Sequence, residues 1–139
     1  MSLYTVTSNP AFADVVTAAL KTESRVLGSA GDAIAALLGA ARPKARFVIL
    51  DLETTADAGR LIDFIKSSPP VRDTLIIAIG TERDFSGLDQ RTCESLNGIL
   101  YSPFTAAQLA LVVTGLAVDL NPDVQSNALT VVRDAREQD

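Results

Sequence analysis

The chain of 139 residues is long enough for one globular domain, and its composition of 47% hydrophobic and 21% charged residues excludes a disordered chain. The net charge of −5 and the lack of clustered lysine or arginine argue against nucleic acid as a partner. Histidine is absent, which removes the commonest acid–base catalyst and the commonest zinc ligand, so we expect neither an enzyme nor a metal site.

The first forty residues predict two strand–helix units. Residues 3–6 form a short run rich in β-branched or bulky apolar residues, which predicts a β-strand. An apolar stripe at helical spacing follows Asn9 and Pro10, which suit the N-cap and the first position of a helix. A shorter, more polar strand is expected at residues 25–27, where it would form an edge of the sheet. A second stripe, at residues 34–41, predicts the next helix.

The middle of the chain predicts the two central strands of a sheet. Residues 47–50 (FVIL) and 75–79 (LIIAI) are apolar at every position, as expected for parallel strands covered by helices on both faces. Between them, a stripe at residues 58–65 predicts a helix that ends before Pro69. Residues 85–96 are mostly polar, so a helix there should be short or irregular.

A last strand is expected at residues 99–101, followed by a helix at residues 105–119. The alternation predicts an α/β fold, a flavodoxin-like (βα)5 three-layer sandwich, and the weak second strand favours the parallel order 2-1-3-4-5. Residues 1–119 would form this domain. Residues 120–139 would be a polar tail, or a linker to a further domain.

In this fold, ligands bind at the carboxyl ends of the strands, so the side chains at those ends decide the function. A buried aspartate at such an end can also serve only to cap the loop that follows it, by accepting backbone N–H groups. The residues at the strand ends are Thr7, Ser8, Asp51, Gly80, Thr81 and Ser102.

Residues 3–119 resemble the receiver domain of two-component response regulators, the CheY-like family. The resemblance rests on Asp51 at the end of FVILD, on Gly59 at the spacing of the family's glycine, and on the segment YSPF at residues 101–104. It implies that Asp51 stands at the phospho-acceptor position. It also implies a role in bacterial signalling.

The sequence departs from the family at the positions whose side chains assist phosphorylation. The family's acidic pair, which holds Mg²⁺, is replaced by Thr7 and Ser8, and its lysine is replaced by Ser102. Gly80 stands where the family has a hydroxyl, although Thr81 is adjacent. We therefore expect a degenerate pseudo-receiver that binds no metal or cofactor and keeps a vestigial phospho-acceptor position. The alternative is a receiver that still accepts a phosphoryl group on its aspartate.

The helix at residues 105–119 carries more apolar residues than a single buried face needs. Leu111 and Val118 are spaced seven apart, away from the stripe that would cover the sheet. Scattered exposed apolar residues are normal, but the resemblance implies a binding face made of the fourth helix, fifth strand and fifth helix. We expect a protein partner or a second copy there.

The leading hypothesis is a phosphorylation-independent interaction or localisation module. The pattern of losses resembles the N-terminal region of TadZ/CpaE-type pilus-assembly proteins, which implies an ATPase domain after residue 139. A nucleotide-binding enzyme is disfavoured, because Gly28 to Ala33 lacks the spacing of a phosphate-binding loop. No apolar run approaches the ~20 residues that span a bilayer, and the single Cys93 suits a reducing compartment, so we expect no membrane insertion and a cytoplasmic location.

Overall fold

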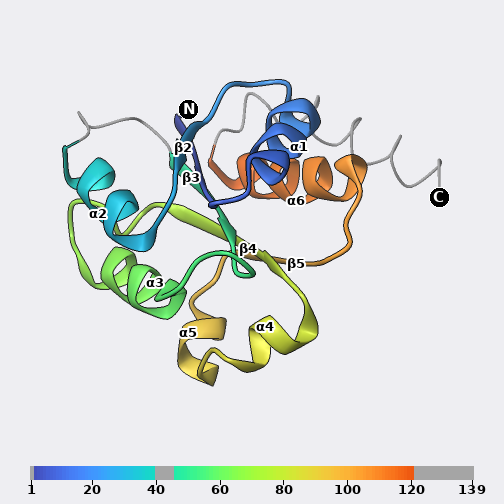
Figure 1. The fold of residues 1–139 in the computed structure, drawn as a ribbon. Helices are drawn as coiled ribbons and strands as arrows, with labels where there is room; N and C mark the ends of the chain where they lie inside the picture. Colours follow the sequence, from blue (N-terminus) through green and yellow to red (C-terminus); the bar gives the residue numbers. More distant parts are fainter. Residues whose placement is uncertain (1, 40–45, 121–139) are drawn as a thin grey trace.

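A computed structural model describes residues 2–39 and 46–120, with side chains up to Ala117. Five strands form one parallel sheet in the order β2-β1-β3-β4-β5, which confirms the predicted fold class and strand order (Figure 1). The strands are β1 (Ser2–Val6), β2 (Arg25–Leu27), β3 (Arg46–Asp51), β4 (Leu75–Gly80) and β5 (Gly98–Tyr101).

Helices cover both faces of the sheet, with α1 and α6 on one side and α2 and α3 on the other (Figure 1). Within the described parts of the chain, no helix is long and apolar enough to span a membrane. The helices are α1 (Pro10–Leu20), α2 (Ala30–Gly39), α3 (Ala58–Ser67), α4 (Glu82–Ser86), α5 (Gln90–Glu94) and α6 (Ala106–Leu120).

Strand β3 shows how the continuous apolar runs serve two cores at once. Val48 and Leu50 belong to the cluster under α2 and α3, whereas Phe47 and Ile49 belong to the cluster under α1 and α6. All four side chains are fully buried. Because successive residues of a strand point to opposite faces, a strand between two helical layers must be apolar at every position.

Local capping explains where two of the helices begin. Asn9 Oδ1 accepts a hydrogen bond from the N–H of Ala11 at 3.0 Å, and Pro10 opens α1, as predicted. Helix α2 extends further toward its N-terminus than the predicted stripe, because Ser29 Oγ accepts the N–H of Asp32 at 3.1 Å. The predicted end of that helix and the tail at residues 121–139 lie outside the described residues.

The polar segment after β4 forms two helices of five residues each, where the sequence predicted one short or irregular helix. Thr81 caps the first one in a capping box with Asp84, and Asp89 caps the second by accepting the N–H of Thr92 at 2.7 Å. Asp89, as an N-cap in the middle of the segment, starts a second helix shortly after the first one ends at Gly87. In Figure 1, α4 and α5 lie below β4 and β5.

Candidate functional site

Asp51 lies at the carboxyl end of β3, the central strand of the sheet, and is only 4% exposed. Three donors surround its carboxylate. The hydroxyl Oγ1 of Thr7 donates to Oδ2 at 2.7 Å, and that of Thr54 donates to the same oxygen at 2.8 Å. The N–H of Glu53 donates to Oδ1 at 3.1 Å. The carboxylate is therefore held by neutral donors alone.

Each of the two hydroxyls also accepts a backbone N–H. Thr7 Oγ1 accepts the N–H of Asn9 at 3.0 Å, and Thr54 Oγ1 accepts the N–H of Ser8 at 3.0 Å. A hydroxyl has one proton to donate and two lone pairs that accept, so both protons remain available for Asp51. The two hydroxyl oxygens lie 3.2 Å apart because they converge on one carboxylate oxygen. The result is a closed network that joins the loops after β1 and β3.

This set of residues does not fit a Mg²⁺ site. Such a hard cation takes oxygen ligands, with carboxylates supplying most of the charge, and among the residues that the structure describes Asp51 is the one buried carboxylate. Its Oδ2 already accepts two hydroxyl protons. In the segments that the structure describes, no group of three or more acidic or cysteine side chains is placed to hold a metal ion. Ser8 is exposed and joins the network only through its backbone N–H.

The other strand-end positions serve structural contacts. A Cβ on Gly80 would lie 3.0 Å from the Cβ atoms of both Leu52 and Asp84, so close approach of these neighbours requires glycine there. Thr81 is exposed, and its Oγ1 accepts the N–H of Asp84 at 3.2 Å as the cap of α4. Ser102 is partly buried, and its N–H donates to the carbonyl of Gly80 at 2.8 Å.

On α6, Leu109 and Val113 are buried against the sheet, as the stripe predicted. Leu111 is partly buried, and the side chain of Val118 lies outside the described part of the chain.

Two groups of residues were missed in the sequence. Thr54 was not predicted to contact Asp51, although a threonine three residues after a strand-end aspartate can bond back to it. The second group is the outward side of β5, where Ile99 and Tyr101 are 42% and 57% exposed. The N–H of Glu53 donates to Asp51 Oδ1, so Asp51 has the loop-capping role that the sequence analysis considered for it. The side chain of Glu53 itself is exposed.

Comparisons with solved structures show that the chain has the fold of receiver domains. It superposes on the receiver domain of NtrX from Brucella abortus with a TM-score of 0.63 and 23% identity, covering 81% of this chain and 94% of that one. It also superposes on the chemotaxis response regulator CheY4 of Vibrio cholerae, with a TM-score of 0.65, 16% identity and coverages of 84% and 95%.

A longer NtrX structure from Brucella abortus matches with a TM-score of 0.68 and 21% identity, over 93% of this chain. The chain spans only 30% of that protein. No protein-family model matches the sequence, and no curated protein does. The likeness is therefore one of fold.

Proposed function

We propose that this domain is a receiver-type signalling module that acts by binding a protein partner and does not depend on phosphorylation. The observation that carries the proposal is the closed hydrogen-bond network around Asp51. At the position where the resemblance expects an acidic residue, Thr7 instead donates a proton to the carboxylate.

Phosphoryl transfer to Asp51 would require hydrogen bonds of this network to break. The reaction needs a free carboxylate oxygen to attack and cations to neutralise the transferred oxygens. Attack through Oδ2 would break two hydrogen bonds to a charged group, worth about 1.5–3 kcal/mol each, whereas attack through Oδ1 would compete only with the N–H of Glu53. No cation compensates within the network, whose donors are hydroxyls and a backbone N–H.

The proposed contact surface is the edge of the sheet at β5 together with the flanking helices α4, α5 and α6. The side chains of Ile99 and Tyr101 provide exposed apolar area on the edge strand, and the ring of Phe85 packs edge-on against Tyr101 at 5.2 Å. Aromatic and large aliphatic residues dominate the energetics of interfaces. Leu111 on α6 remains part of the proposed surface. A solved structure of similar fold is a receiver dimer, the beryllofluoride-activated NtrC4 domain, so a second copy is one candidate for the partner.

We extend the proposal to the context of the domain. Because the similar NtrX protein is about three times longer, this fold occurs joined to further chain, and a following ATPase domain, as in pilus-assembly proteins, is our specific candidate. The location would be the cytoplasm, and the domain itself would have no catalytic activity. The second candidate function, a phospho-accepting receiver, is favoured by one observation: Asp51 ends the central strand of a receiver fold.

Titration with Mg²⁺ and beryllofluoride, followed by the backbone NMR signals of residues 51–55, separates these two functions. We expect no metal-dependent shifts in the native chain at low millimolar Mg²⁺. As a positive control, the double variant Thr7→Asp, Ser8→Asp restores the acidic pair and should show such shifts. Saturable shifts in the native chain would instead establish the phospho-accepting alternative.

A second experiment tests the binding surface. Ile99→Glu places a charge on the β5 edge, and Val26→Glu places one on the opposite edge strand β2, where Val26 is 50% exposed. We expect Ile99→Glu to abolish association with the partner or with a second copy in sedimentation experiments, and Val26→Glu to leave it unchanged. Equal behaviour of the two folded variants would contradict the proposed surface.

A further inference from the structure

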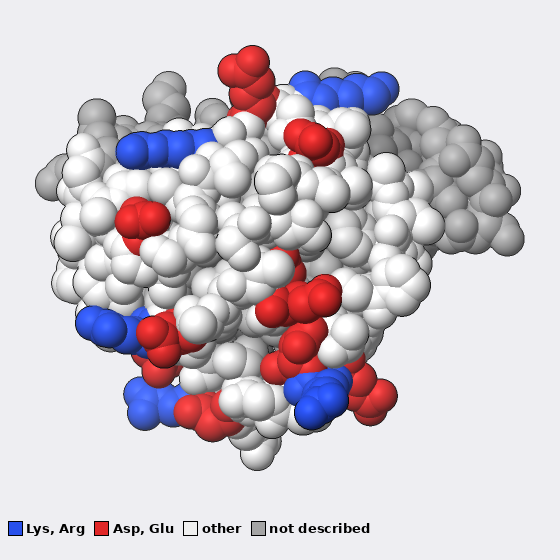
Figure 2. All heavy atoms as spheres, viewed as in Figure 1, with Lys and Arg blue, Asp and Glu red and all other residues white. Residues whose placement is uncertain are grey.

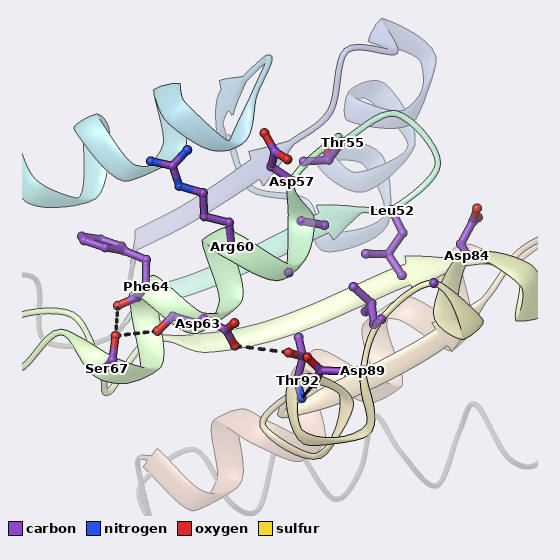
Figure 3. Close-up of a pocket in the computed structure, with 14 residues that line it drawn as sticks. Leu52, Thr55, Asp57, Arg60, Asp63, Phe64, Ser67, Asp84, Asp89 and Thr92 are labelled. Atoms are coloured by element: carbon purple, nitrogen blue, oxygen red, sulfur yellow. Dashed lines mark hydrogen bonds between the residues drawn. The ribbon is translucent and has the colours of Figure 1, made fainter.

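A groove of about 800 Å³ lies between α3 and the pair α4–α5, on the side of the molecule away from α1 and α6 (Figures 1 and 3). It begins beside Leu52 and Thr55, in the loop that follows Asp51, and runs along α3 to Ser67. A smaller hollow of about 350 Å³ continues it past Lys66.

The groove exists because small residues line it and one hydrogen bond bridges its base. Gly59 of α3 has no side chain, and a Cβ built there would lie 3.7 Å from Leu88 Cδ2, at ordinary contact distance. Thr92 Oγ1 of α5 donates to Asp63 Oδ1 of α3 at 3.2 Å, which ties the two walls together (Figure 3). Leu88 and Phe64, both partly buried, add apolar lining.

The rim is acidic. Asp57, Asp63, Asp84 and Asp89 line the larger hollow, where the one lining cation among the described residues is Arg60, shown in Figure 3 away from Asp84. Two further cations, Lys66 and Arg91, line the smaller hollow. In Figure 2, acidic side chains lie over the lower half of the molecule, with lysine or arginine side chains among them.

These carboxylates keep the capacity to bind a cation. Asp63, Asp84 and Asp89 each accept a hydrogen bond through one oxygen, and a carboxylate has about four lone-pair sites. The side chain of Asp57 forms no capping hydrogen bond. The backbone N–H of Thr92 lowers the pKa of Asp89, which keeps this carboxylate ionised.

We propose that this groove binds a protein segment that places an arginine side chain next to a large apolar side chain. The apolar lining would take the aliphatic or aromatic group, and the carboxylates of the rim would take the guanidinium, whose fork of donors matches carboxylate geometry. The groove shares α4 and α5 with the contact surface proposed above, but no residue of β5 or α6 lines it, and the inference does not depend on that proposal. Through Thr55, whose N–H donates to the carbonyl of Asp51 at 3.1 Å, the bound segment would contact the loop of the closed network.

The probe is a short synthetic peptide with a leucine flanked by two arginines, and the matched peptide has glutamates in place of the arginines. Binding is followed by the backbone NMR signals of Gly59, Gly87 and Leu88. We expect saturable shifts with the arginine peptide, weakening with salt because exposed charges are screened, and none with the glutamate peptide.

Two variants locate the site. Gly59→Gln fills the groove at a position where a Cβ meets only an ordinary contact, and its control is Gly115→Gln on α6, where nothing lies within 4 Å of the added Cβ. We expect at least tenfold weaker binding for the first variant and unchanged binding for the second. Asp57→Asn removes one rim charge at a φ of 59°, which asparagine tolerates, and should weaken binding severalfold with a smaller salt dependence.

Several results would overturn the proposal: absence of binding by the arginine peptide, equal binding of both peptides, or shifts centred on Ile99 and Tyr101. Shifts of groove signals with protein concentration alone would assign the groove to a second copy and also overturn it. If a thermal melt shows that Gly59→Gln fails to fold, the test is the binding of the arginine peptide to Asp57→Asn. Unchanged binding by that variant rejects the site.

Discussion

Replacing Thr7 by valine tests whether the closed network stabilises the fold. The substitution keeps the shape of a buried side chain and removes one hydroxyl. Asp51 Oδ2 then loses its 2.7 Å hydrogen bond, and the N–H of Asn9 loses its acceptor. A hydrogen bond to a charged group is worth about 1.5–3 kcal/mol. The added methyl group recovers up to about 0.8 kcal/mol. The net expectation is a loss of about 1–2 kcal/mol in the free energy of unfolding.

Urea denaturation followed by circular dichroism measures this loss. The midpoint should fall while the slope m stays the same, because m reports the surface exposed on unfolding. The matched control is Thr5→Val on the same strand, where the hydroxyl donates to Ser24 Oγ at 2.9 Å. A hydrogen bond between neutral groups is worth about 0.5–1.5 kcal/mol, so the control should lose less.

Two results would refute the reasoning. An unchanged urea midpoint for Thr7→Val would mean that the hydroxyl contributes nothing to holding Asp51. Equal losses for the two valine variants would mean that the charge of the carboxylate is irrelevant and that the cost is generic to buried threonines.

Three further predictions follow from the same structure. Asp51→Asn should leave partner binding within about twofold, since the proposed function does not use the carboxylate; a complementation assay checks this, and a folded variant that behaves as a null would contradict it. Gly80→Ala should destabilise the domain by about 1–3 kcal/mol, because the new Cβ would lie 3.0 Å from that of Leu52, and thermal melting measures the loss. Asp89→Ala should destabilise the domain at neutral pH and lose this effect in acid. The N–H of Thr92 lowers the pKa of Asp89 below its ordinary value of 3.8, so its contribution is present above that pH and disappears as the pH falls through the folded-state pKa. Melts of both chains from pH 7 to about pH 2.5 should therefore converge, and a constant difference would contradict the assignment.

The order of the elements could be predicted because it depends on patterns within short segments. The runs FVIL and LIIAI are central strands for a reason that holds locally, since only a strand covered on both faces has no polar position. The start of α1 at Asn9 and Pro10 is equally local, because the cap bonds to the backbone two residues further on. The sparse apolar residues after β4 indicated a short or irregular helix for the same local reason, but not its division into two.

The site was predicted only in part. The place of Asp51 at a strand end followed from the pattern, but its partner Thr54 depends on how the next loop turns back. Counting back from Ser102 pointed to Gly80, with Thr81 as its neighbour. In the structure Gly80 is the last residue of β4 and Thr81 caps α4, a role that depends on where the next helix begins.

The sequence by itself determined the alternation of strands and helices, the central position of β3 and the absence of the acidic pair after β1, all of which depend on residue type and short-range spacing. Only the tertiary structure decided that the hydroxyls of Thr7 and Thr54 converge on one oxygen of Asp51, from loops 47 positions apart. The same is true of the groove between α3 and α5. Contacts between distant segments depend on how packed elements meet, and no local preference of the chain encodes that geometry.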